Sequence, residues 1–105
     1  LGAVLRDRNA LVVASTDLSH FHRDEEAREI DARTIVDVRT FDFRRLMSDL
    51  AEGSVEACGG GPAVAVMTAL KALGATRVEI LGYATSGDIT GDLRRVVGYL
   101  SAVAY

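Results

Sequence analysis

The sequence of 105 residues contains no tryptophan, one proline and a single cysteine, Cys58. One cysteine excludes an intrachain disulfide framework, which favours a reduced, cytoplasmic compartment. The sequence also lacks any run of about 18 uncharged apolar residues, so no segment is predicted to span a membrane. The formal net charge of -3 gives no reason to expect binding to nucleic acid or to an anionic membrane surface.

The remaining composition is that of an ordinary globular protein, with 49% hydrophobic and 26% charged residues. A length of 105 residues suits one domain. It is near the lower limit for an α/β fold that is stable by itself. The chain opens with Leu1 instead of methionine, and Leu1–Arg6 is typical of the tail of a helix. We therefore expect residues upstream of Leu1, with 1–105 forming a single partial domain.

Hydrophobic patterning predicts one strand and two helices in the first half of the chain. Leu11–Ala14 is a short β-branched apolar run, which favours a buried strand. Asp24–Arg39 carries apolar residues at helical spacing among charged ones, as in an amphipathic helix. Asp42 is suited to cap a second helix that ends near Gly53.

The second half predicts a helix, a strand, a loop and a final strand. Ala63–Leu73 is apolar nearly all round, so this helix should be deeply buried. Val78–Ala84 has the composition of a strand, and Thr85–Leu93 that of a polar loop. Val96–Tyr105 predicts a last strand, antiparallel to Val78–Ala84.

This order of elements predicts an α/β fold, a mixed sheet with flanking helices. A strand that returns to its own sheet through helices implies parallel pairing by a right-handed crossover. The first and second predicted strands are therefore expected to lie parallel.

Asp17 and His20 follow the first predicted strand, where ligands collect in open α/β sheets. Their spacing of three permits a shared face if the segment turns helically. An imidazole beside a carboxylate suits proton transfer or metal ligation. The alternative is that Asp17 caps a turn and His20 is a packing or surface residue, and the short pattern leaves both interpretations open.

Cys58 stands before three glycines and a predicted helix N-terminus. Backbone N–H groups and the positive end of the helix dipole favour a thiolate there. The glycines let the main chain approach a ligand or an ion without steric interference. Cys58 is therefore a candidate reactive thiolate or metal ligand, with a small buried hydrophobe in a tight turn as the open alternative.

Two other kinds of site lack their motifs. Ser15, Ser19 and Ser86 are candidate nucleophiles, but the G-x-S-x-G elbow of many serine hydrolases is absent. The glycines after Cys58 are not followed by the Lys-Ser/Thr pair of a phosphate-binding P-loop.

Several motifs together resemble the Memo family, which includes the B component of the AmmeMemoRadiSam system. The matching segments are Val12–His22, Ala57–Pro62, Tyr83–Asp92 and Val97–Tyr105. They cover nearly the whole chain in the right order and spacing, which is far more specific than any one motif.

The resemblance implies a fold similar to the class III extradiol dioxygenases, which use non-haem iron. It implies a pocket of two histidines from an N-terminal half, absent here, with an Asp, a His and a Cys matching Asp17, His20 and Cys58. Cys58 would ligate the metal as a thiolate, His20 would serve as the acid/base histidine, and Asp17 would orient or neutralise its neighbours. Ser19, Gly59, Gly60 and Ser86 are expected to line this pocket.

The function implied is that of a non-haem metal-site protein with iron or copper, a candidate metal-dependent oxidoreductase. The family has a Cys where such dioxygenases have a carboxylate ligand, and a soft thiolate changes metal preference. The alternative is therefore a non-catalytic binding or regulatory module that recognises a peptide or partner protein. Other expected partners are the N-terminal half of the same protein and a radical-SAM protein.

If that half supplies strands to the same sheet, residues 1–105 alone expose an edge and part of the core. Weak stability or self-association is then expected.

Overall fold

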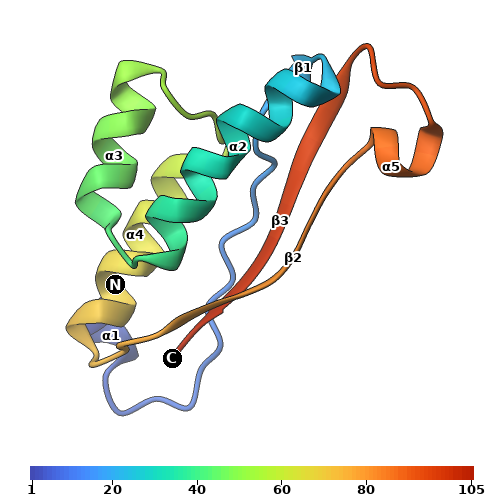
Figure 1. Cartoon of the computed structure of the whole chain (residues 1–105). Helices are drawn as coiled ribbons and strands as arrows, with labels where there is room; N and C mark the ends of the chain where they lie inside the picture. Colours follow the sequence, from blue (N-terminus) through green and yellow to red (C-terminus); the bar gives the residue numbers. More distant parts are fainter.

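The computed structural model describes the whole chain, residues 1–105, as one α/β unit. In chain order the elements are α1 (Gly2–Leu5), β1 (His20–His22), α2 (Asp24–Arg39), α3 (Phe43–Glu52), α4 (Gly60–Ala72), β2 (Val78–Thr85), α5 (Gly87–Thr90) and β3 (Val96–Ala104). Helices α2, α3 and α4 gather on one side of a long, twisted ribbon formed by β2 and β3 (Figure 1).

The sheet has three strands in the order β1-β3-β2, and every pair is antiparallel. β2 pairs along its whole length with β3, from Val78 opposite Ala104 to Thr85 opposite Gly98. β1 meets β3 only at its first residues, Val96 and Val97. Beyond Val97, the edge of β3 that faces away from β2 therefore has no strand partner.

Two predicted helices and one strand pairing are confirmed. α2 has the predicted bounds, Asp24–Arg39. The Asp42 carboxylate accepts the Arg45 N–H at 3.0 Å and caps α3, while Gly53 ends this helix with a positive φ of 78°. The antiparallel pairing of β3 with β2 is also as predicted.

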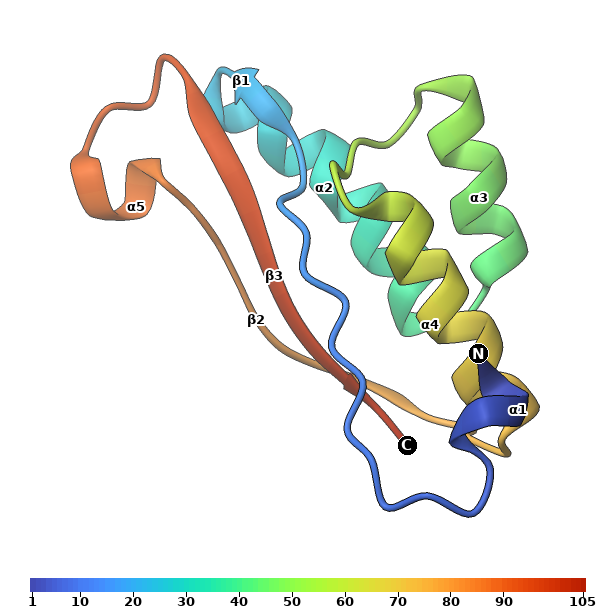
Figure 2. The same ribbon diagram turned by 180° about the vertical axis from the view of Figure 1, so that it is seen from behind.

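The predicted parallel pairing is wrong, because Leu11–Ala14 is not a strand of the sheet. The segment runs extended past β3 (Figure 2), and residues 9–16 make no backbone–backbone hydrogen bond. It lies across an apolar cavity from β3, too far to join the ladder. Without this strand no parallel crossover exists, and the sheet is antiparallel throughout, not mixed.

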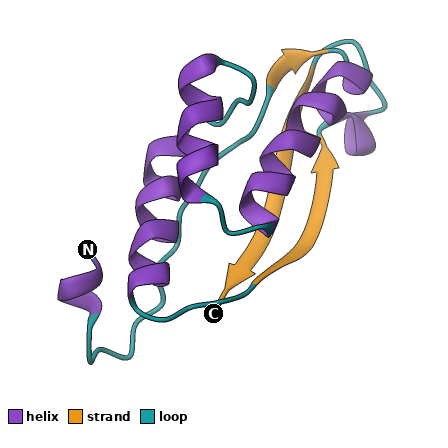
Figure 3. Cartoon of the chain, turned by 60° about the vertical axis from the view of Figure 1, so that its left-hand side comes forward, coloured by secondary structure: helices purple, strands orange, loops and turns teal.

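Two further expectations are corrected. The predicted deeply buried helix begins at Gly60, and only Gly60, Met67 and Ala69 are buried in it. α4 packs on α3 and α1, and its other residues are half-buried or exposed; Figure 3 shows α4 next to α3, on the side of the molecule away from α5. The predicted loop after β2 contains α5, because the Asp88 carboxylate accepts the Thr85 N–H at 2.9 Å and closes the turn.

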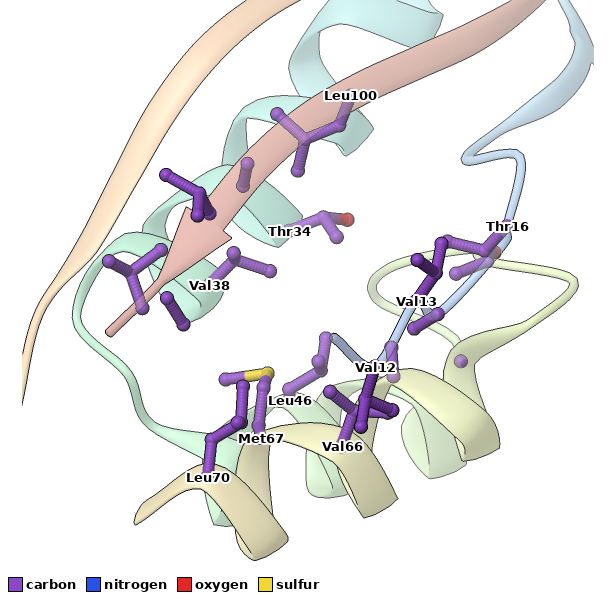
Figure 4. Close-up of a pocket in the computed structure, with 18 of the residues that line it drawn as sticks. Val12, Val13, Thr16, Thr34, Val38, Leu46, Val66, Met67, Leu70 and Leu100 are labelled. Carbon is purple, nitrogen blue, oxygen red and sulfur yellow. The ribbon is translucent and has the colours of Figure 1, made fainter. Parts of the chain in front are cut away.

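The hydrophobic core cluster is small, and Val78 of β2 and Ala104 of β3 pack against it. Phe41, Leu46, Val55 and Met67 form it between α3 and α4. An apolar cavity of about 430 Å³ lies beside this core, lined by Leu46 and Met67, by the C-terminal half of β3 and by the extended segment (Figure 4). Helices α3 and α4 therefore pack incompletely against β3, whereas α2 packs on both β2 and β3.

The inner face of α2 is unusually polar, with Asp31, Thr34 and Asp37 buried beside Ala27. Burial raises the pKa of Asp37 to about 6, and the neighbouring Asp49 carboxyl adds to the rise. Arg45 lies 3.3 Å from one oxygen of Asp37, and the other oxygen has no partner. At neutral pH Asp37 is therefore a buried ionised group, and its burial lowers the free energy of unfolding.

This burial predicts a stability that falls with rising pH. The native state binds the Asp37 proton more tightly than the unfolded chain, whose ordinary pKa is 3.8. Stability should therefore decrease between about pH 4 and pH 6, by at most about 3 kcal/mol, and then level off. Urea unfolding from pH 4 to pH 8 measures this slope. Asp37→Asn should remove this contribution and be more stable than the wild type at pH 8; identical pH profiles for the two proteins would contradict it.

Candidate metal centre

Two segments far apart in the chain bring Asp17 and His20 together with Cys58. Asp17 ends the extended segment, His20 begins β1, and Cys58 lies on the loop before α4. One donor atom from each lies within 4.8 Å of the other two. His20 Nε2 is 3.6 Å from Asp17 Oδ2, and the Asp17 N–H donates to Cys58 Sγ at 3.3 Å.

Backbone hydrogen bonds place these segments. The Cys58 N–H donates to the Asp17 carbonyl at 3.2 Å, so the two loops meet directly. On the other side, the Leu18 N–H donates to the Gly98 carbonyl and the Gly98 N–H to the Ser19 carbonyl, at 2.9 and 3.0 Å. The cluster is therefore attached to both β3 and the start of α4.

The donor set fits a metal ion. Three atoms no farther apart than 4.8 Å leave a point within about 2.8 Å of all of them. Shifts of about 0.5–0.8 Å would then reach the bond lengths of about 2.0–2.3 Å usual for thiolate, imidazole and carboxylate ligands. A set of S, N and O donors suits iron, copper or zinc better than magnesium or calcium. With three ligands the coordination sphere keeps open positions, and all three residues retain solvent exposure.

His22 points to a different partner. Its Nε2 lies 2.6 Å from Glu56 Oε2, and this contact, more than the nearby Glu26, raises the pKa of His22. The other Glu56 oxygen accepts the His20 N–H at 3.4 Å. Glu56 therefore ties the Cys58 loop to β1 beside the cluster, a role that no local sequence pattern indicates.

Asp31 is a second residue that the sequence interpretation missed. Its buried carboxylate accepts the Ser19 N–H at 3.0 Å and the Tyr83 O–H at 2.6 Å. Burial, together with this hydrogen bond, raises the pKa of Tyr83. Asp31 thus holds the residue before His20 against α2 and β2. Its helical spacing of four from Ala27 is a signal that could have placed it on the inner face.

Phe21 has a strained backbone beside the cluster. Its φ is 65°, a left-handed conformation that is an outlier for a bulky residue. The conformation accompanies a register irregularity between His20 and His22. The Phe21 ring is exposed, packs edge-on against the His20 ring at 5.7 Å and carries the Arg95 guanidinium 4.9 Å above its centre. Such strain clusters at functional sites.

The four residues expected to line the pocket have different positions. Ser19 is fully buried and its hydroxyl has no partner. Gly59 contacts Thr16, and Gly60 packs against a leucine of α3. The Ser86 hydroxyl accepts the Val97 N–H at 3.1 Å on the β2 side of β3. His20 pairs with the other edge of β3, so Ser86 is not brought into the cluster.

The fold and the cluster define an α/β protein with a candidate thiolate-containing metal centre. The family model described as "Memo-like protein" matches residues 1–103. The chain belongs to the Memo-like protein family.

Three archaeal relatives show the extent of the likeness. A MEMO1 family protein of Methanocaldococcus jannaschii is 43% identical over 97 residues, which are 92% of this chain and 34% of that protein. MEMO1 family proteins of Methanobrevibacter smithii and Methanosarcina mazei are 40% and 38% identical, over 92% and 91% of this chain and 34% and 36% of those proteins. The chain thus spans about a third of the length of the curated relatives it matches.

No solved structure matches the chain significantly. None of its helices combines the length and the apolar character needed to cross a bilayer.

Proposed function

We propose that this chain supplies Asp17, His20 and Cys58 to the metal site of a metal-dependent oxidoreductase whose fold is related to the class III extradiol dioxygenases. The observation that supports the proposal is the convergence of three chemically different donor atoms within 4.8 Å, from segments about 40 residues apart. The metal proposed is iron or copper, which would supply a redox-active Lewis acid when bound.

Each residue has a role that follows from its chemistry. Cys58 acts as a thiolate ligand, and the Asp17 N–H at 3.3 Å stabilises negative charge on its sulfur. His20, 3.6 Å from the Asp17 carboxylate, either ligates the metal or moves a proton at its Nε2. Asp17 orients this imidazole and offsets positive charge at the site.

The remaining ligands are proposed to come from outside residues 1–105. Two histidines of an N-terminal half would complete the coordination sphere, consistent with a chain that spans about a third of its relatives. A radical-SAM protein and a peptide or partner protein are the proposed external partners. The cytoplasm remains the proposed compartment.

Metal content tests this function. In the full-length polypeptide that carries this chain, Cys58→Ala should lower bound iron or copper at least tenfold, because it removes the thiolate ligand, and His20→Ala should lower it as well if His20 ligates the metal. Elemental analysis after purification and after reconstitution measures it. Asp17→Asn should show a loss that the matched control Asp92→Asn does not, since exposed Asp92 pairs only with Arg94. Equal metal content in the wild type, Cys58→Ala and His20→Ala would remove the metal role.

A second candidate function is a non-catalytic binding module. The exposed Phe21 ring favours it, because a strained aromatic residue with a guanidinium on its face offers a contact for a peptide or partner protein. Turnover of a catechol-type substrate with oxygen uptake by the full-length protein would count against this function. A partner retained by the wild type and lost on Asp17 or His20 substitution would favour it.

A further inference from the structure

Thr16 connects the two loops that carry the candidate ligands. Its hydroxyl oxygen accepts the Gly59 N–H at 2.8 Å and donates to the Asp17 carbonyl at 2.7 Å. The same oxygen lies 3.8 Å from Cys58 Sγ. The Thr16 side chain therefore contacts Gly59, which follows Cys58, and also Asp17, whose N–H donates to the Cys58 sulfur.

The close approach of the loops at this point depends on Gly59. A Cβ atom there would lie 2.8 Å from the Thr16 Cβ and still closer to the Ser15 carbonyl oxygen, nearer than real Cβ contacts allow. Figure 4 shows Thr16 on the extended segment, next to the loop that leads into α4. Ser15 and Thr16 thus occupy the space that a side chain at position 59 would need, and the Thr16 hydroxyl accepts the N–H of the buried Gly59.

We propose that Thr16 is a positioning residue for the thiolate ligand. By holding the Gly59 N–H, its hydroxyl sets the place of Cys58 Sγ against the Asp17 N–H and within reach of His20. Thr16 Oγ1 also lies 3.8 Å from the sulfur, a long contact in which either atom could donate. This inference rests on the proposed metal site and adds the group that preorganises it.

Thr16→Val tests the hydroxyl with little change in shape. Valine cannot accept the Gly59 N–H, which would be left buried without a partner, and the two loops would separate. Loss of an outer-shell partner of a metal ligand typically weakens metal affinity about 10–100-fold, and we expect a loss in this range. Thr16→Ser keeps the hydroxyl and should bind metal within about threefold of the wild type.

The experiment uses Co²⁺ with the full-length polypeptide that carries this chain. Competition with a chelator measures the Co²⁺ dissociation constant, and the sulfur-to-cobalt absorption band reports the thiolate contact itself. We expect at least a tenfold weaker Co²⁺ affinity and a weakened or shifted band for Thr16→Val, with both restored in Thr16→Ser. A merely structural Thr16 would change the unfolding midpoint while the affinity and the band stayed the same.

The outcomes separate this inference from the proposed function. Wild-type affinity in Thr16→Val, or equal losses in the Val and Ser variants, would overturn the role of the hydroxyl while the metal site stood. Absence of Co²⁺ binding and of the sulfur band in the wild type would overturn both. Should circular dichroism show that Thr16→Val is unfolded, Thr16→Ala compared with Thr16→Ser decides the same question with smaller side chains.

Discussion

Gly98→Ala is expected to lower the free energy of unfolding by about 3 kcal/mol or more. Gly98 lies in β3, and a Cβ there would lie 2.8 Å from Cγ of the Asp31 carboxylate and still closer to one carboxylate oxygen. That carboxylate cannot move aside freely, because it accepts hydrogen bonds from Ser19 and Tyr83 and is fully buried. The new methyl group would therefore break at least one of these bonds or bend β3.

The effect should extend to the candidate metal centre, because Gly98 also pairs with the backbone of Leu18 and Ser19. Urea unfolding of the full-length polypeptide measures the loss. Gly82→Ala is the matched control: Gly82 lies in the neighbouring strand β2, and a Cβ there meets nothing within 4 Å. It should change stability by less than about 1 kcal/mol. Similar values for the two variants would show that the contact with Asp31 does not constrain position 98.

Residues 1–105 on their own are expected to associate through the apolar cavity and the free edge of β3. Leu11 and Val13, on the segment without backbone partners, are 86% and 75% exposed and line this cavity. The buried Thr34 hydroxyl at the same cavity has no hydrogen-bond partner. An unpaired edge beside exposed apolar side chains is a site for strand pairing with another chain or another part of the same protein.

Leu11→Lys should weaken this association about 10–100-fold, because burial of a leucine contributes about 1.5–3 kcal/mol. Analytical ultracentrifugation across a concentration series measures the association constant. Ile89→Lys is the matched control, since Ile89 is 90% exposed on α5 and lies away from the cavity lining. A monomer with a cooperative unfolding transition at ordinary temperature would contradict the expected association.

Local sequence signals determined the helices and the position of the candidate ligands. Apolar spacing gave the bounds of α2, and the cap at Asp42 with the glycine at position 53 gave those of α3, because these signals act within a few residues. The Memo resemblance identified Asp17, His20 and Cys58 as a set, and the structure brings their donor atoms together.

Only the tertiary structure decided how the strands pair and which polar groups support the site. The apolar run Leu11–Ala14 has strand composition, but a strand needs a partner, and across the cavity β3 is out of reach. The buried carboxylate of Asp31 and the hydroxyl of Thr16 owe their roles to Ser19, Tyr83 and Gly59, which lie 12 to 52 residues away in the chain. No periodicity or short motif encodes such pairs, because their energies depend on contacts that exist only after the chain has folded.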